Sequence, residues 1–108
     1  MNQRRSLTAD HLYRNDARLE VRSGGVRPEA KRRVSEGDLL WADVVFVMER
    51  GHKQRIAQEF AGLTLPPIEV LDVPDDYDYM DADLQEMLRL TLDPEFDARI
   101  AARPATKN

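Results

Sequence analysis

The segment that follows the last expected strand brings carboxylates and aromatic rings together in a form that suits acid catalysis. It reads Val73-Pro74-Asp75-Asp76-Tyr77-Asp78-Tyr79. Three carboxylates this close repel one another, and burial raises a carboxyl pKa further, so one of them can stay protonated near neutral pH. Such a carboxyl can protonate a leaving alkoxide or phenoxide. The first tyrosine of the segment could form a wall for an aromatic substrate.

The first residues of the chain combine two arginines with an expected helix start. Arg4 and Arg5 precede Ser6, a typical N-cap residue. Free backbone N–H groups and the positive end of the helix dipole would then lie beside the guanidinium groups. Because arginine can hold a phosphate with two parallel hydrogen bonds, the segment Asn2–Ser6 predicts an oxyanion-binding cradle.

Both segments also have plain structural interpretations. A charged stretch is most often solvated surface, and this applies to the acidic segment as well as to the arginine pair. Carboxylates can also bind Mg²⁺ or Ca²⁺, but the acidic segment has no histidine nearby and its spacing matches no calcium loop. We expect His11 and His52 on exposed helix surfaces.

The composition narrows the class of protein. The 108 residues are enough for one domain, with 42% hydrophobic and 33% charged residues and a net charge of −4. No apolar run is long enough to span a membrane, and the absence of cysteine excludes disulfides and cysteine-based metal sites. The aromatic residues are not interleaved with the basic ones, which disfavours nucleic-acid binding. We expect a cytoplasmic protein with no membrane or nucleic-acid partner.

Alternating helices and strands would position the two charged segments. We expect helices over 6–13, 28–33, 35–41, 52–60 and 80–92, and strands over 19–21, 44–48 and 68–73. The run Val44–Met48 is apolar at every position, as in a parallel strand buried on both faces. Asp93-Pro94 is expected to end the last helix, which leaves a domain over 1–92 and a C-terminal tail over 93–108.

Short strands that alternate with helices predict a parallel α/β sheet. Ligands bind such sheets beyond the carboxyl ends of the strands, where helix N-termini also point. The arginine-bearing segment Asn2–Ser6 and the loop Pro74–Tyr79 would both lie at that edge.

Five pieces of the chain, taken in order, resemble the low-molecular-weight protein tyrosine phosphatase family in its short bacterial form. The family's phosphate loop reads Cys-x-x-Asn-x-x-Arg-Ser, and Asn2, Arg5 and Ser6 have the matching spacing. The likeness covers about residues 2–90. Its other pieces are Thr8-Ala9-Asp10, Ser23-Gly24-Gly25-Val26, Trp41-Ala42-Asp43 with the strand up to Glu49, and Val73-Pro74-Asp75-Asp76-Tyr77.

The resemblance implies a three-layer α/β sandwich, with a small parallel sheet flanked by helices, and a phosphate cradle at the N-terminus. Arg5 would clamp the phosphoryl oxygens. The backbone N–H groups from Asn2 through Gln3 and Arg4 to Ser6 would complete the cradle. Asn2 would also brace the loop, and the Ser6 hydroxyl would stabilise a thiolate. The family uses no metal or other cofactor and forms a phosphocysteine intermediate that water hydrolyses.

The resemblance also assigns the acid and the ligand. Asp75 would protonate the departing tyrosine oxygen, and Tyr77 would border the pocket for a phosphate or phosphotyrosine-bearing ligand. Asp76 stands where the family has proline. It remains a second candidate for the acid.

The family's nucleophile and first strand have no counterpart in this sequence. The cysteine belongs two residues before Met1, and the 108 residues contain no cysteine. In the family, the first strand lies between the strands expected at 19–21 and 44–48, so without it an interior sheet edge has unpaired backbone groups. We therefore expect this chain to be inactive as given. Either the reading frame starts upstream or the chain is a truncated binding form.

Two non-enzymatic functions stay open beside the phosphatase. One is a binding domain for phosphate or a phosphopeptide, centred on Arg5. The other is an interaction domain whose unpaired sheet edge recruits a strand, including by self-association.

Overall fold

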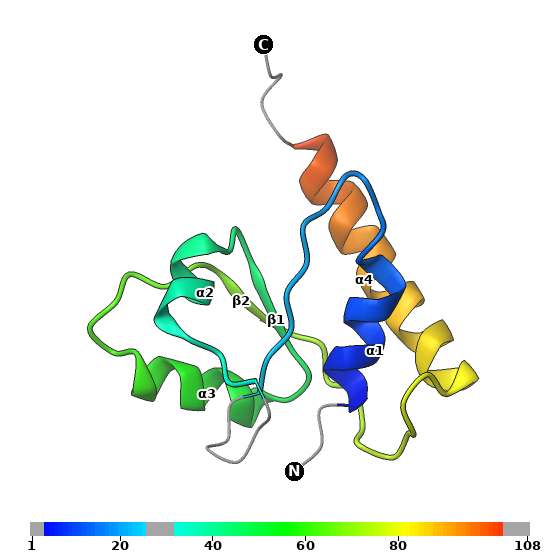
Figure 1. Ribbon diagram of the computed structural model, residues 1–108, viewed down its shortest axis with the longest axis horizontal. Coiled ribbons are helices and arrows are strands. Elements are labelled where there is room, and N and C mark those ends of the chain that lie inside the picture. Colours follow the sequence, from blue (N-terminus) through cyan, green and yellow to red (C-terminus); the bar gives the residue numbers. More distant parts are fainter. Residues whose placement is uncertain (1–3, 26–31, 103–108) are drawn as a thin grey trace.

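The computed structural model describes residues 4–25 and 32–102, and this part of the chain forms four helices and a two-stranded sheet (Figure 1). The sheet is parallel, with Val45 opposite Ile68 and Val47 opposite Val70. The α/β class expected from the sequence is confirmed at this level. In chain order the elements are α1 (Arg4–Tyr13), α2 (Glu36–Trp41), β1 (Val45–Val47), α3 (Arg50–Glu59), β2 (Ile68–Val70) and α4 (Ala82–Ala101).

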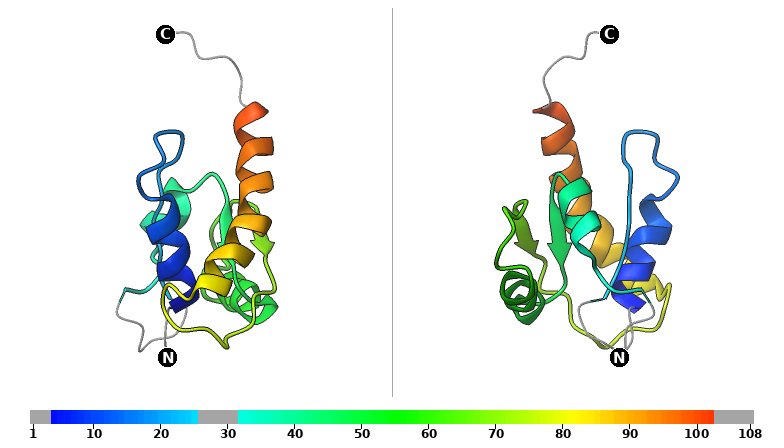
Figure 2. Two further views of the ribbon diagram at one scale, coloured as in Figure 1. Left: turned by 90° about the vertical axis from the view of Figure 1, so that its right-hand side faces the viewer. Right: turned by 60° about the vertical axis from the view of Figure 1, so that its left-hand side comes forward.

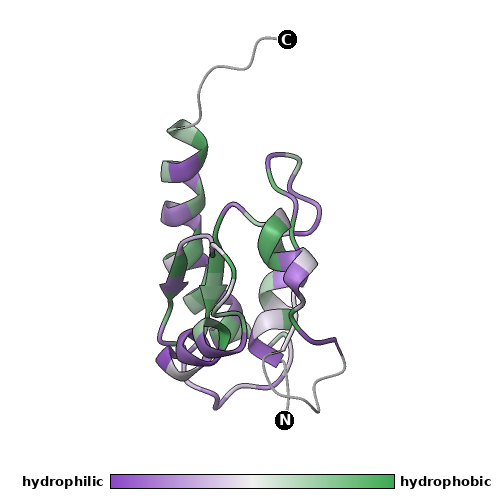
Figure 3. Ribbon diagram, turned by 90° about the vertical axis from the view of Figure 1, so that its left-hand side faces the viewer, coloured by the Kyte–Doolittle hydropathy of each residue, from purple (hydrophilic) through white to green (hydrophobic). Residues whose placement is uncertain are grey.

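Helices cover both faces of the sheet (Figures 1 and 2). On one face, Phe46 of β1 packs against a core that includes Tyr13 of α1 and Leu88 of α4. On the other face, Val47 shares a core with Ile56 of α3. Neighbouring residues of a strand point to opposite faces, so an apolar strand such as β1 serves both cores (Figure 3).

The start of α2 follows the sequence prediction. Ser35 is its N-cap, and the Ser35 hydroxyl accepts a hydrogen bond from the N–H of Asp38. The Asp38 carboxylate in turn accepts one from the Ser35 N–H. This capping box fixes the first turn of a helix too short to be stable alone.

Three local predictions differ from the structure. Helix α1 begins at Arg4, so Ser6 lies inside the first turn and is not the N-cap. Residues 19–21 form no strand, because no strand lies beside them in the described residues. The helix predicted over 28–33 falls mostly outside the described residues, and its last two positions are not helical.

Helix α4 also differs, because it continues through Pro94 to its end at Ala101. Proline removes a backbone N–H and would normally stop the helix at Asp93. Here Leu92 and Phe96 pack into the core on either side of the proline and hold the helix in register. The carbonyl that loses its donor belongs to Leu90, which is 71% exposed, so water can replace the missing hydrogen bond.

Candidate functional site

Arg5 lies at the carboxyl edge of the sheet, in the first turn of α1, and only 4% of it is exposed. Its Nη1 atom donates a hydrogen bond of 2.5 Å to the backbone oxygen of Val73. Its Nη2 atom lies 2.7 Å from Oε2 of Glu49. Glu49 follows β1 and Val73 follows β2, so the guanidinium group spans the ends of both strands. An arginine this deeply buried needs such partners to offset the loss of its hydration.

Asp75 lies beside this guanidinium group. Its Oδ1 atom is 3.6 Å from Nε of Arg5. The same oxygen is buried and accepts no hydrogen bond from the described residues. The Asp76 side chain is exposed, and Asp78 instead forms an ion pair with Arg4 at 3.4 Å. Of these three carboxylates, Asp75 is the one that shares a site with Arg5.

Two further residues near the carboxyl edge of the sheet were not among the predicted site residues. Thr8 is fully buried, and its hydroxyl accepts a hydrogen bond from the backbone N–H of Met80, which ties α1 to the end of the acidic segment. Glu49 binds Arg5 directly. The sequence does contain a signal for Glu49, because an acidic residue directly after an apolar parallel strand lies at the ligand-binding edge.

The remaining predicted site residues are spread more widely. Asn2 and Gln3 lie outside the described residues. Tyr77 packs against the core of α1 and α4. Ser6 lines a neighbouring cavity, and so does Arg5. The structure therefore brings Arg5 and Asp75 together, whereas it uses Tyr77 in packing.

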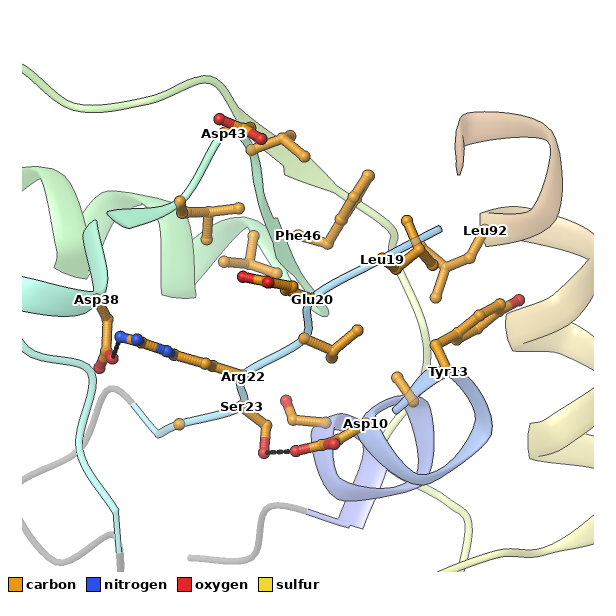
Figure 4. A pocket seen from close by; sticks show the side chains of 18 of the residues that line it. Asp10, Tyr13, Leu19, Glu20, Arg22, Ser23, Asp38, Asp43, Phe46 and Leu92 are labelled. Carbon is orange, nitrogen blue, oxygen red and sulfur yellow. Dashed lines mark hydrogen bonds and ion pairs between the residues drawn. The ribbon is translucent and has the colours of Figure 1, made fainter. Parts of the chain in front are cut away.

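That cavity, of about 990 Å³, lies between β1 and the extended residues 19–25 (Figure 4). Residues 19–25 line one side, and residues 41–48 line the other. Arg5 and Ser6 lie at its end near the carboxyl edge of the sheet. We name this cavity the interstrand groove. Asp75 and Tyr77 do not line it, so the groove meets the acidic segment at Arg5 and at Met48, whose oxygen accepts a hydrogen bond from the Val73 N–H.

The outer wall of the groove is fixed to the two neighbouring helices. Ser23 donates a hydrogen bond of 2.8 Å to Asp10 of α1. Arg22 lies 3.2 Å from Asp38 of α2 (Figure 4). Its guanidinium group also stacks over the ring of Trp41, 4.0 Å from the ring centroid. These contacts hold the wall away from β1 and keep the groove open.

Compared with protein-family models, with curated proteins and with solved structures, the chain gives no match. No three His, Asp or Glu side chains of the described residues gather in a way that could hold a metal ion, so a cation site in the acidic segment gains no support. No helix in the described part of the chain is long and apolar enough to cross a membrane.

Proposed function

We propose that this chain carries the phosphate-binding arginine and the general acid of a phosphomonoesterase similar to the low-molecular-weight protein tyrosine phosphatases. In this proposal Arg5 binds the phosphoryl oxygens and Asp75 is the acid. A phosphate or phosphotyrosine-bearing molecule is the ligand. Because the 108 residues contain no cysteine, they do not turn over a phosphoester unless a cysteine is supplied.

One observation carries the proposal, the contact between Arg5 and Asp75. The two residues are far apart in the sequence, and the fold places the guanidinium Nε 3.6 Å from the carboxylate Oδ1. The pair lies where the two parallel strands end, which is the position where α/β sheets bind ligands. Phosphoester chemistry uses a buried arginine beside a carboxyl group, and the Oδ1 atom of Asp75 accepts no hydrogen bond from the described residues.

The chemistry assigned to the pair has two steps. In the first, a thiolate attacks phosphorus, the bond from phosphorus to the leaving oxygen breaks, and Asp75 gives its proton to that oxygen. In the second, the Asp75 carboxylate takes a proton from water as the water oxygen attacks the phosphocysteine, which releases phosphate and the thiolate. Arg5 would hold the phosphoryl oxygens in both steps, and Glu49 orients the guanidinium group.

The position of the interstrand groove supports the proposed similarity of this fold to that of the phosphatase family. It lies between residues 19–25 and β1. This is where the resemblance places the family's first strand, which would precede the phosphate loop. We therefore propose the three-layer fold of that family with its first strand missing from these residues.

The test is an extended chain that supplies an apolar strand and a cysteine two positions before Met1. We expect it to hydrolyse p-nitrophenyl phosphate. The 108-residue chain should be inert, and so should the same extension with serine in place of cysteine. Within the extended chain, Asp75→Asn should lower kcat by about 10²–10⁴-fold, because a general acid contributes that much. Asp76→Asn is the matched control and should leave kcat nearly unchanged.

Two results would contradict the proposal. One is an extended chain that is folded by circular dichroism and still turns over no substrate. The other is an equal loss of kcat in Asp75→Asn and Asp76→Asn. Arg5→Lys adds a check on the cradle, because lysine keeps the charge but cannot form two parallel hydrogen bonds to a phosphate, so turnover should fall.

A further inference from the structure

The edge of β1 that borders the interstrand groove carries free backbone groups. The N–H of Val45 donates to the Pro67 oxygen at 2.9 Å, and the Val47 oxygen accepts from the Leu71 N–H at 2.8 Å. Both residues therefore direct their backbone groups toward β2. Successive residues of a strand alternate in this respect, so the N–H and C=O of Phe46 point away from β2 and toward the groove.

The opposite wall of the groove carries a second set of free backbone groups. Residues 19–25 run in the same direction as β1 (Figure 1). The backbone groups of Glu20, Val21 and Arg22 form no hydrogen bond with another described residue. An extended peptide between the two walls would present N–H and C=O groups to both of them, as a central strand does in a sheet.

Apolar side chains line both faces of the groove, beside charged ones such as Glu20 and Arg22. Tyr13 and Phe96 line it from the side of α1 and α4, and Leu39 and Ile56 line it from the side of α2 and α3. Val44–Phe46 are only partly buried, although an all-apolar run of this kind is typical of a strand covered on both faces. An apolar strand in the groove would complete their burial.

The charges at the two ends of the groove set a direction for such a strand. Asp43 and Glu20 line the groove, and neither forms an ion pair with another described residue. Asp43 precedes β1, whereas Arg5 lies at the carboxyl end of the sheet. Arg99 also lines the groove, but it is paired with Glu95 at 2.6 Å. Arg5 is likewise paired, with Glu49 at 2.7 Å. A peptide parallel to β1 would bring its amino end toward Asp43, where a basic residue would meet a carboxylate that has no ionic partner among the described residues.

We propose that the interstrand groove binds a peptide of another molecule as an inserted parallel β-strand. The peptide has about five consecutive apolar residues, roughly the length of an ordinary strand. It carries a basic residue at its amino end. This inference does not depend on the proposed phosphoester chemistry, because the peptide contains no cysteine and its test measures binding alone. It concerns the 108-residue chain, because the strand supplied in the extended chain would occupy the same groove.

The experiment uses the 108-residue chain and a labelled synthetic peptide, Lys-Val-Leu-Val-Ile-Val-Asp. Binding is measured by anisotropy of the label and by the fluorescence of Trp41, the single tryptophan, which lines the groove. The control peptide has the same side chains but is methylated on alternate backbone nitrogens, so it cannot donate to one of the two walls. We expect it to bind at least about tenfold more weakly, because several hydrogen bonds are lost.

Two protein variants test the direction of the strand. Asp43→Lys should weaken binding several-fold, and a peptide with glutamate in place of its lysine should restore it. Leu40→Lys is the matched control, because Leu40 is 65% exposed on α2 and does not line the groove, and it should bind like the unaltered chain.

Four results would overturn the proposal. They are no binding of the peptide, equal binding of the methylated peptide, equal effects of Asp43→Lys and Leu40→Lys, and a dimer in sedimentation that the peptide does not dissociate. The last result would mean that a second copy of the chain covers the groove. A dimer that the peptide does dissociate supports the proposal.

Discussion

The hydroxyl oxygen of Thr8 accepts a hydrogen bond of 3.0 Å from the backbone N–H of Met80. The same hydroxyl donates to the Arg4 oxygen at 2.7 Å, so both its donor and its acceptor capacity are used. Met80 has a φ angle of 62°, in the left-handed region that a residue with a side chain seldom adopts. The buried Thr8 side chain thus fixes the turn that leads from the Asp75 segment into α4 against the helix that carries Arg5.

Replacing Thr8 by valine should destabilise the fold. Valine has nearly the same shape but no hydroxyl, so the N–H of Met80 loses its partner in a partly buried contact, which costs about 1 kcal/mol. Thr8→Ser is the matched control, because serine keeps the hydroxyl and loses only a methyl group. Urea unfolding measures both free energies. Valine no more destabilising than serine would show that water or another group satisfies the Met80 N–H.

Elements whose sequence signal is local agree with the structure. The capping box at Ser35 lies within one turn of helix, so four neighbouring residues are enough to predict where α2 starts. The apolar run Val44–Met48 contains β1, and the acidic segment follows β2 as expected. Such signals need no knowledge of distant contacts.

Elements that depend on distant partners could not be predicted in the same way. A strand over 19–21 needs a neighbour, and in the described residues β1 pairs only with β2. The end of α4 depends on core contacts of Phe96 that overcome the effect of Pro94. The contact between Arg5 and Asp75 depends on both strand ends. The sequence predicts the edge at which these two residues lie but not the distance between them.

Asp38 makes the stability of the chain sensitive to acid. Burial raises the pKa of its carboxyl, but hydrogen bonds from Arg32, Ser35 and Arg22 lower it more, from 3.8 to about 2. Because the folded state has the lower pKa, this contribution is complete above about pH 4 and is lost as the pH falls through about 2. It amounts to roughly 1–2 kcal/mol, since one pKa unit is about 1.4 kcal/mol and Asp38 is partly screened by solvent.

Asp38→Asn tests this contribution through urea unfolding at a series of pH values. The variant should be less stable than the unaltered chain at pH 7, and the difference should shrink between pH 4 and pH 2. Asp43→Asn is the control, because Asp43 is exposed and forms no ion pair with another described residue. A difference between Asp38→Asn and the unaltered chain that stays constant down to pH 2 would assign the effect to packing and not to charge.

In the proposed phosphate site, Glu49 would compete with an anion for Arg5. Its carboxylate lies 2.7 Å from Nη2 of Arg5, on an edge of the guanidinium group that a phosphate would use. Glu49→Gln should therefore have two effects. The variant should be less stable in the absence of phosphate, because the buried arginine loses an ionic partner. Inorganic phosphate should then raise its melting temperature more than that of the unaltered chain, because a ligand that binds the folded state stabilises it by mass action.

Thermal unfolding over a range of phosphate concentrations separates this effect from a general loss of charge. Glu59→Gln is the matched control, because it removes an ion pair of the same length, 2.7 Å, with Arg33, on an exposed surface. We expect the phosphate response of Glu59→Gln to equal that of the unaltered chain, and the affinity of Glu49→Gln to rise by about tenfold, or about 1.4 kcal/mol. If Glu49→Gln and Glu59→Gln respond alike, phosphate does not compete with Glu49, and Arg5 serves to join the strand ends and not to bind an anion.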